Sequence, residues 1–454
     1  MPANLTEGRL VPAIWRYTIP IILTGVLQLL FNAADLVVVG QACGSISVAA
    51  VGATTAIINL LVNLFIGISV GAGVTVAHAL GAGHDSDVRS TVHTAIPAAL
   101  VSGAFLTAVG VICSRQFLAW MSTPDDVIGL SAIYMRIYFC GTIPGMLYNF
   151  GAAILRAAGD TKGPLVYLSA AGVINVLLNL FFVIVLHMDV AGVALATSIS
   201  QGISAALVLR ALMRRTDACR LDLRAIRFHR VQLMKIIRIG LPAGIQNSLF
   251  SISNVLIQSS VNTFSSVAMS GNAAAMNIEG FVYISMNAFH QTALNFTGQN
   301  YGCGRFDRMA RIERICLCSV CLVGIVLGAL AVLFSHPLLH IYLTDSEEAV
   351  QYGVTRLMCI CLPYFLCGLM DVTTGLIRGM GSSVPPMLIC ILGVCGLRIL
   401  WICTVFRMPE YHTLPGLYFS YTVSWLVTFL CELAVFRILF VRARRLAERD
   451  SAAI

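Results

Sequence analysis

Charge is scarce in this sequence. Of its 454 residues, 21 are Asp or Glu and 29 are Lys or Arg, so only 11% are charged, while 58% are hydrophobic. A water-soluble domain carries about 25% charged residues on average. The composition therefore excludes an ordinary soluble protein and predicts an integral membrane protein.

The sequence also lacks the alternation of polar and apolar residues that a membrane barrel requires. Its apolar stretches are continuous and reach the roughly 20 residues of a membrane-spanning helix. Only helices and closed barrels satisfy their backbone hydrogen bonds in lipid, so we predict an all-α integral membrane fold. Twelve transmembrane helices are expected, near residues 11–39, 48–79, 92–113, 127–153, 164–187, 190–213, 236–262, 270–298, 315–335, 350–376, 386–406 and 415–440.

No stretch between these spans is long enough for a separate soluble domain. The amino end lacks the basic start of a cleavable signal peptide, so none is expected. The longest connector, residues 214–235, is basic and has six spans on either side. We predict an N-terminal lobe over 1–213, a cytoplasmic linker over 214–235, and a C-terminal lobe over 236–454 that ends in a basic cytoplasmic tail.

Short motifs recur at a nearly constant distance in the two halves. LRAAGDTKGP at 155–164 and IRGMGSSVPP at 377–386 share an Arg, a Gly and a final Pro, 222 positions apart. Pro20 in WRYTIP and Pro242 in IRIGLP keep the same offset, and the glycines of ALGAGHD and QNYGCGRFD differ by 221. These landmarks indicate a duplicated six-helix unit. An even number of spans per unit makes both copies face the same way, so we expect two pseudo-two-fold-related six-helix lobes.

The basic residues agree with this arrangement. If the amino end is cytoplasmic, 24 of the 29 Lys and Arg residues fall in cytoplasmic segments, as the positive-inside rule requires. This bias predicts cytoplasmic N- and C-termini, and it explains the net charge of +8 without a nucleic-acid partner. Most of the 15 cysteines lie inside spans, where Cys behaves as a small apolar residue, so no metal site is expected.

A few polar residues lie where lipid should exclude them. A carboxylate at the bilayer centre costs about 2.5–3.5 kcal/mol on insertion scales, so its presence needs a reason. Asp35, Glu279 and Asp371 are such residues. Asn175 and Asn179 are one helical turn apart and share a face. A carboxylate with amide and hydroxyl oxygens suits a proton or a small hard cation, although such residues can also form a hydrogen-bond cluster that only holds helices together.

The two six-helix halves, the GQNYGCG turn at 298–304, and the RAAGDTKGP and RGMGSSVPP turns together resemble the multidrug and toxic compound extrusion (MATE) family over the whole chain. The resemblance implies two lobes around a central cavity and export of cationic or amphipathic small molecules in exchange for inward H+ or Na+. It also implies a monomeric, multi-pass transporter of the bacterial inner membrane with neither enzyme activity nor a cofactor, whose partners are small organic molecules and membrane lipids.

The sequence is more similar to DinF-like than to NorM-like members of that family. This similarity implies a cation- or proton-binding set in the N-terminal lobe formed by Asp35, Asn175, Asn179 and Thr197, with a kink of the first helix at Pro20. The family's fifth-helix acid is replaced by Asn179, so the set has one carboxylate fewer.

The resemblance also suggests how exchange would work. A deprotonated Asp35 is neutralised by a cation or by a proton, but not by both, so inward ion flow would drive cargo out as the lobes rock between alternating states. H+ and Na+ both remain open as coupling ions. In the C-terminal lobe, Glu279 and Asp371 are candidate ligands for cation or substrate.

Two other classes of membrane protein fit the sequence less well. A lipid-linked oligosaccharide flippase of the same superfamily usually has fourteen spans and a basic central cavity, whereas this sequence has twelve spans and few embedded basic residues, chiefly Arg136 and Arg398. A membrane prenyltransferase needs clustered acids for Mg2+, and the adjacent acids Asp125 and Asp126 lie in a single short connector. The efflux transporter is therefore the preferred interpretation, with the flippase as the alternative.

Overall fold

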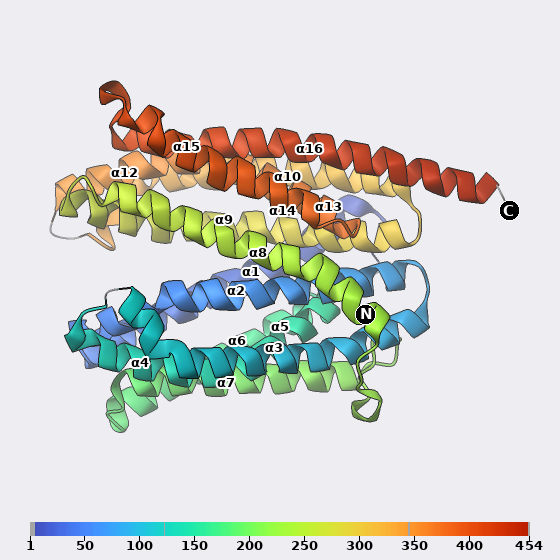
Figure 1. Ribbon diagram of the computed structural model, residues 1–454, viewed down its shortest axis with the longest axis horizontal. Coiled ribbons are helices and arrows are strands. Elements are labelled where there is room, and N and C mark those ends of the chain that lie inside the picture. Colours follow the sequence, from blue (N-terminus) through green and yellow to red (C-terminus); the bar gives the residue numbers. More distant parts are fainter. Residues whose placement is uncertain (1–4, 122, 344–345, 453–454) are drawn as a thin grey trace. The chain divides into compact units, whose positions relative to one another are not determined.

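The computed structural model describes residues 5–121, 123–343 and 346–452, and every regular element within them is a helix (Figure 1). The first half contains α1 (Leu10–Ala42), α2 (Ser45–Gly81), α3 (Asp85–Trp120), α4 (Asp125–Cys140), α5 (Thr142–Ala157), α6 (Lys162–Leu180), the π-helical η1 (Phe181–Val185), α7 (Asp189–Met213) and the 3-10 turn η2 (Leu223–Ala225). The second half contains α8 (Arg230–Val261), α9 (Ser266–Gly302), α10 (Phe306–Leu333), α11 (Ser335–His340), α12 (Glu347–Cys361), α13 (Tyr364–Gly379), α14 (Val384–Cys390), the π-helical η3 (Ile391–Gly396), α15 (Leu397–Cys403), the 3-10 turns η4 (Val405–Arg407) and η5 (Pro409–Tyr411), and α16 (Leu414–Ala452).

Each predicted span coincides with one helix or with consecutive helical segments. Within the described residues, eight helices are long and apolar enough to cross a membrane, or ten if the bent pairs α4–α5 (46°) and α12–α13 (44°) each count as one span. The two bends lie at Gly141 and near Pro363, which are separated by the repeat offset. The other two predicted spans, α8 and α9, are long enough but less apolar. Polar side chains such as Gln246, Asn247 and Asn272 lower their mean hydropathy.

The helices present large apolar side chains outward. Ile112, Leu333 and Leu392 are 77%, 73% and 71% exposed. Extensive apolar exposure marks a surface that lipid or another protein covers, and helices of spanning length indicate lipid. These outward faces agree with a multi-pass membrane protein.

The repeated sequence motifs adopt the same backbone conformation. Gly159 and Gly381 have φ angles of 84° and 82°, and Gly83 and Gly304 both have a φ of 69°. A side chain is disfavoured at these left-handed values, so Gly is the fitting residue. The amide groups of Gly159 and Gly381 each donate to the carbonyl three residues earlier, at 2.9 and 2.8 Å. The paired glycines therefore serve the same helix-ending turn in both halves.

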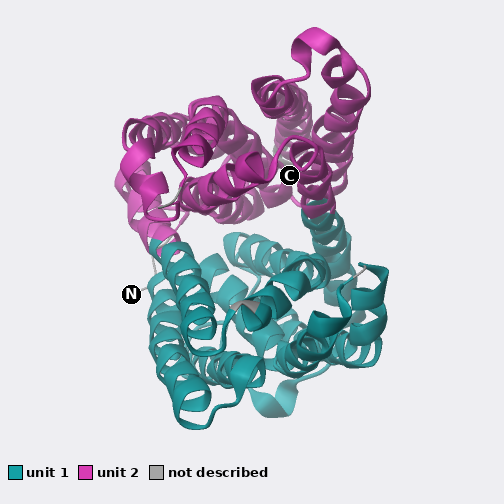
Figure 2. Cartoon of the chain, turned by 90° about the vertical axis from the view of Figure 1, so that its left-hand side faces the viewer, with its two compact units in different colours: residues 1–4, 23–248 teal, residues 5–22, 249–454 magenta. Residues whose placement is uncertain are grey.

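The chain folds into two compact units, coloured separately in Figure 2. Unit 1 contains Leu23–Ser248, and unit 2 contains Leu5–Ile22 together with Leu249–Ile454. These boundaries differ from the lobes predicted at 1–213 and 236–454. The first part of α1 belongs to unit 2 and the first part of α8 belongs to unit 1, because each of these helices runs from one unit into the other.

Both crossings follow a proline within the helix. α1 passes into unit 1 after Ile22, and α8 passes into unit 2 after Ser248, while Pro20 and Pro242 lie inside these helices. Pro20 is accommodated within one continuous helix of 33 residues. A proline lacks the amide that would bond the carbonyl four residues earlier, so each helix has one weakened position shortly before it changes unit.

Unit 2 holds the first part of α1 through side chains of α9. Two aromatic pairs meet edge to face, with ring centroids 5.4 and 5.3 Å apart, and two buried hydroxyl groups are hydrogen-bonded at 2.8 Å. These contacts join Trp15 to Phe289, Tyr17 to Phe296 and Thr18 to Thr292. The start of α1 is thereby fixed in unit 2, while its remainder belongs to unit 1.

Unit 1 holds the first part of α8 by close backbone packing against α2. A Cβ added to Gly244 would lie 2.0 Å from the carbonyl oxygen of Leu64, and one added to Gly67 would lie 2.1 Å from the amide nitrogen of Gly244. Cβ atoms at Gly71 and Gly240 would lie 2.2 and 2.5 Å from the facing backbone. Two small-xxx-small pairs thus face each other, an arrangement that lets membrane helices approach closely.

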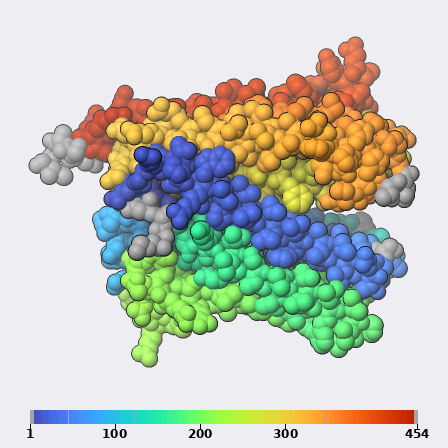
Figure 3. Space-filling view, turned by 180° about the vertical axis from the view of Figure 1, so that it is seen from behind, coloured from blue at the N-terminus to red at the C-terminus, as the bar shows by residue number. Residues whose placement is uncertain are grey.

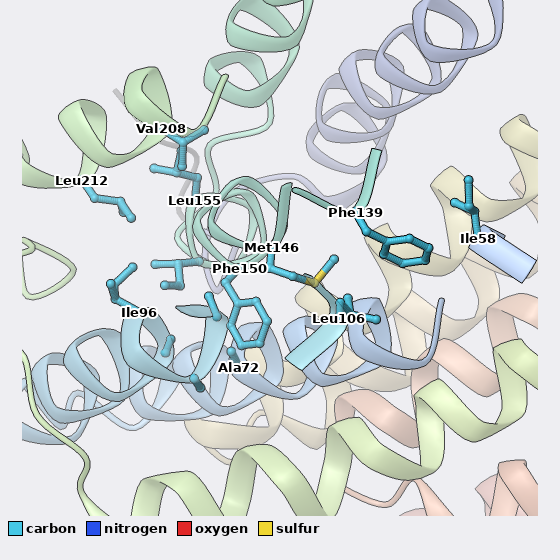
Figure 4. Close-up of a cluster of buried hydrophobic side chains, with 14 of the residues drawn as sticks. Ile58, Ala72, Ile96, Leu106, Phe139, Met146, Phe150, Leu155, Val208 and Leu212 are labelled. Atoms are coloured by element: carbon cyan, nitrogen blue, oxygen red, sulfur yellow. The ribbon is translucent and has the colours of Figure 1, made fainter. Parts of the chain in front are cut away.

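Large apolar side chains fill the centre of unit 1. In Figure 4 they come together from α2, α3, α4, α5 and α7, and Leu106, Phe139 and Phe150 are fully buried. This packing gives α2, α3 and α7 a fixed arrangement around α5.

The connector between α7 and α8 is the yellow-green projection in the space-filling view (Figure 3). The amide of Asp222 donates to Nε2 of His93 on α3 at 3.1 Å. The Arg215 guanidinium hydrogen-bonds Asp217 and holds the pKa of that carboxyl below its usual value, so this pair remains charged at neutral pH. The predicted linker is therefore an ordered segment attached to unit 1.

Candidate functional site

The four residues predicted for the N-terminal site form one chain of hydrogen bonds in unit 1. Asn179 donates from Nδ2 to Oδ1 of Asp35 and also to Oδ1 of Asn175, the latter at 3.3 Å. Asn175 in turn donates from Nδ2 to Oγ1 of Thr197 at 3.4 Å. Three helices, α1, α6 and α7, thus contribute to a single polar cluster, which brings together the four residues that the family resemblance implied.

The cluster is buried around its amides. Asn179 is 0% exposed and Asn175 is 5% exposed, whereas Asp35 and Thr197 are half-buried. Oδ1 of Asn179 accepts no hydrogen bond from any residue in the described part of the chain. A buried acceptor without a donor is costly, and a cation bound beside Asp35 would satisfy it.

Asp35 has no basic partner within the described ranges. The neutral amide of Asn179 donates a hydrogen bond to it, and no charged residue of those ranges neutralises it. Carboxylate, amide and hydroxyl oxygens are ligands for hard cations, and a carboxylate also accepts a proton. The cluster can therefore exchange one positive charge for another at Asp35.

A glycine that the sequence analysis did not identify sets the approach of α1 to α6. A Cβ added to Gly172 would lie 1.8 Å from the ring of Phe31. Phe31 is one helical turn before Asp35, and Gly172 is one turn before Asn175 on the same face. Because Gly172 has no side chain, the Phe31 ring packs against α6. This close packing brings the Asp35 carboxylate, on the same helix as Phe31, to Asn179.

Gly172→Ala is expected to lower gradient-driven export severalfold while the protein still folds, because the Phe31 ring must move and take Asp35 with it. Dye efflux from vesicles measures this loss. The double variant Gly172→Ala/Phe31→Ala should recover much of the rate, since the ring no longer blocks the new methyl group. Gly52→Ala is the matched control, because a Cβ there meets nothing within 4 Å. Unchanged export by Gly172→Ala would show that this contact does not position Asp35.

Glu279 has a different environment from Asp35. Its Oε2 lies 2.8 Å from Nη2 of Arg356, and the two side chains are 9% and 4% exposed. Arg356 also donates from Nη1 to Oδ1 of Asn272 at 2.7 Å, and the hydroxyl of Tyr418 donates to the same oxygen at 2.9 Å. Glu279 is therefore already neutralised within unit 2, and its expected role as a free cation ligand would require this ion pair to open.

Glu279→Gln is expected to destabilise the protein by about 3–5 kcal/mol, because it leaves the Arg356 charge buried without a partner. The double variant Glu279→Gln/Arg356→Met should regain most of that loss. Thermal unfolding in detergent, followed by size-exclusion chromatography, gives the comparison, with the exposed Glu348→Gln as control. If the single and double variants were equally stable, the ion pair would not be what stabilises this region.

Asp371 lies on α13 in a second acidic region of unit 2. Its backbone carbonyl is hydrogen-bonded to Nδ1 of His290 at 2.6 Å. The carboxylate oxygen Oδ2 is buried and has no hydrogen-bond partner among the described residues. Asp371 therefore has no ion pair like that of Glu279 within the described residues, and the buried Arg378 acts on it electrostatically.

Glu432 on α16 was missed by the sequence analysis. It is 0% exposed, and both of its carboxylate oxygens accept from the Thr374 hydroxyl, at 2.8 and 2.9 Å. Cys390 adds a weaker contact at 3.4 Å. An acid within the apolar stretch LVTFLCELAVF was the available signal, since a buried intramembrane carboxylate marks a functional candidate. Asp371 and Glu432 interact electrostatically, which makes them the two acids of this region.

Comparison with known proteins agrees with these features. A family model described as MatE matches residues 20–181 and 242–403, and the two matches begin 222 positions apart, the offset found between the repeated motifs. The chain is 28% identical to "Probable multidrug resistance protein YoeA" of Bacillus subtilis, over 94% of both chains. It is 23% identical to "Probable multidrug resistance protein NorM" of Thermotoga maritima, over 85% of this chain and 83% of the other.

The fold is also found among solved structures. The structure titled "Outward-facing conformation of a multidrug resistance MATE family transporter of the MOP superfamily" superposes with a TM-score of 0.91, over 97% of this chain and 98% of the other, at 20% identity. The predicted all-helical, MATE-like fold is thereby confirmed. These matches do not favour the flippase alternative.

Proposed function

The chain belongs to the MatE family, whose members are transporters and not enzymes, and from this we propose that it exports cationic or amphipathic small molecules across the bacterial plasma membrane in exchange for inward H+ or Na+. The single observation that supports exchange most strongly is Asp35, a carboxylate hydrogen-bonded to the buried Asn179 with no basic partner among the described residues. Asn175, Asn179 and Thr197 are the accompanying ligands.

The exchange follows from the energy of a charge in the membrane. A deprotonated Asp35 in a poorly solvated site is unfavourable until a positive charge arrives. A proton or Na+ on the carboxylate removes the attraction for a cationic cargo, and a cationic cargo removes the need for the ion. Because one carboxylate holds one positive charge, inward movement of the ion drives outward movement of the cargo.

α1 offers a route by which occupancy of Asp35 could alter the protein. Its first part is fixed to α9 in unit 2 by Trp15, Tyr17 and Thr18, and its later part carries Asp35 in unit 1. A proline-weakened position, Pro20, precedes the crossing. We propose that neutralising Asp35 shifts α1 and thereby the equilibrium between alternating states of a rocking-bundle transporter.

Orientation and assembly belong to the same proposal. The distribution of Lys and Arg supports a cytoplasmic location for both termini, and we propose that the transporter acts as a monomer. Reporter fusions at the carboxyl end test the first point: a cytoplasmic reporter should be active there and a periplasmic one should not.

Dye efflux from vesicles with separately imposed H+ and Na+ gradients tests the function. Export of a cationic dye under one of the two gradients supports exchange and identifies the ion. A protein that moved dye under neither gradient would not be an antiporter of this kind.

A further inference from the structure

Arg398 is a buried basic residue that the proposed exchange at Asp35 does not use. It lies on α15 in unit 2 and is 2% exposed. Its guanidinium is stacked over the ring of Tyr421, 4.0 Å from the centroid, and lies 6.0 Å from that of Trp425. The planar guanidinium is thus held in a defined position over the Tyr421 ring, and its N–H groups point outward within the plane of the guanidinium.

The hydrogen bonds of Arg398 go only to neutral groups. Nε donates to Oγ of Ser424 at 3.2 Å, and Nη1 donates to Oγ of Ser253 at 3.4 Å and to Oδ1 of Asn254 at 3.3 Å. All three are longer than the usual 2.9–3.0 Å of such bonds. Nη2 makes no hydrogen bond with any residue that the structure describes. Of the five N–H donors of the guanidinium, several therefore remain available for a ligand.

No acid in the described part of the chain neutralises Arg398. Across the described ranges, no carboxylate lies within 4.0 Å of its guanidinium, and its electrostatic neighbours are Tyr421, Tyr364, Cys367 and Cys395. Arg356 in the same unit provides the contrast, because Glu279 pairs with it at 2.8 Å. A lone buried charge is strongly unfavourable unless a partner arrives, and inside a membrane it marks a functional site whose partner has to be named.

In the sequence repeat, Arg398 lies in the part of unit 2 that corresponds to the Asp35 cluster of unit 1. Its charge is opposite to that of Asp35. Helices α1, α6 and α7 supply the Asp35 cluster, and their repeat counterparts α8, α14–α15 and α16 supply Asn254, Arg398 and Ser424. Subtracting the repeat offset of 222 from 398 gives position 176, directly after Asn175. The same three helices of the duplicated unit therefore carry an acid in unit 1 and a base in unit 2.

We propose that Arg398, with Ser253, Asn254 and Ser424, binds an anionic group, a carboxylate or a phosphate, of the molecule that the protein exports. This inference rests on the proposed export function and narrows its cargo: molecules with an anionic group are accepted at unit 2, in addition to the cationic group accepted at Asp35. The planar N–H fork of Arg matches carboxylate and phosphate geometry. Asn254 is exposed, so the anion reaches Arg398 from the side on which Asn254 lies.

Flavin mononucleotide and riboflavin provide a matched pair of probes, since they differ by one phosphate and are both fluorescent. Each is titrated against the purified full-length protein in nanodiscs of phosphatidylcholine. We expect flavin mononucleotide to bind about tenfold more tightly or better, because hydrogen bonds to a charged group are among the strongest. Equal affinity of the two flavins for the wild-type protein would overturn the proposal.

Asn254→Asp is the most informative variant, because it changes an exposed residue by one atom and supplies Arg398 with a carboxylate. It should remove the preference for flavin mononucleotide without disturbing the fold, and Arg398→Gln should do the same. Arg407→Gln, at an exposed arginine in η4 of the same unit, should keep the preference. A preference retained in Asn254→Asp would overturn the proposal even if Arg398→Gln failed to fold.

Two further measurements separate the remaining explanations. A phosphate could also come from a lipid headgroup, so the titration is repeated in phosphatidylglycerol nanodiscs. If that lipid abolished flavin mononucleotide binding by the wild-type protein, the site would bind a lipid phosphate, and the proposal that it binds the exported molecule would be wrong. Efflux of a cationic dye under an ion gradient tests the export function separately, so intact efflux without phosphate preference would reject the anion site alone.

Discussion

Asp35→Asn is expected to abolish ion-driven export, reducing it to the leak rate seen without a gradient, while expression and fold are retained. Asn has nearly the same shape as Asp and can still accept a hydrogen bond from Asn179, so the helix contact survives. It carries no charge, however, and therefore cannot exchange a cargo cation for a proton or Na+. Dye efflux from vesicles with an imposed H+ or Na+ gradient measures the loss.

Two companion variants make this result interpretable. Asp126→Asn removes an exposed acid of the same unit and should leave export unchanged. The exchange variant Asp35→Asn/Asn179→Asp moves the carboxylate to the other end of the same hydrogen bond and should restore part of the gradient-driven rate. Wild-type export by Asp35→Asn alone would remove Asp35 from the mechanism.

Gly244→Leu is expected to be among the most destabilising substitutions in unit 1. Even a Cβ at this position would lie 2.0 Å from the carbonyl oxygen of Leu64, and a backbone atom cannot move aside as a side chain can. Overpacking of a core typically costs about 1–3 kcal/mol, and a clash of backbone against backbone should exceed that range. The expected result is little folded protein after mild heating, measured by size-exclusion chromatography in detergent.

Gly202→Leu is the control for this substitution. It also adds a leucine side chain to a helix of unit 1, but a Cβ at Gly202 meets nothing within 4 Å. It should therefore retain nearly the wild-type melting temperature. Similar stability of the Gly202→Leu and Gly244→Leu proteins would mean that α2 and α8 do not depend on this close approach.

The apolar helical segments and the duplication could be predicted from the sequence because both depend on local properties. A run of apolar residues must form a helix in lipid whatever its neighbours are, and a repeated turn needs Gly wherever its φ is positive, as at Gly159 and Gly381. The Asp35 cluster could also be predicted. A carboxylate in an apolar stretch and two amides one turn apart are visible in one dimension, and the family resemblance supplied the helices that join them.

The partners of the other charged residues could not be predicted in this way. Glu279 and Asp35 look alike in the sequence, yet Glu279 is paired with Arg356 from 77 positions away, while Asp35 has only a neutral amide. Arg398 was visible as an embedded base, but its lack of an acid became apparent only when its surroundings were known. Whether a buried charge is neutralised depends on the distance, to within a few ångströms, between segments that are far apart in the sequence. No local sequence pattern encodes that distance.

The sequence by itself determined that lipid surrounds this protein, which segments are helical, that the chain contains an internal repeat, and that Asp35 is an acid within an apolar stretch. These properties follow from hydrophobicity, length and spacing along the chain. The tertiary structure alone decided where α1 and α8 change unit, which glycines let helices touch, and which charges stand alone. Those outcomes follow from close packing, in which one missing side chain, as at Gly172 or Gly244, sets the distance between two backbones.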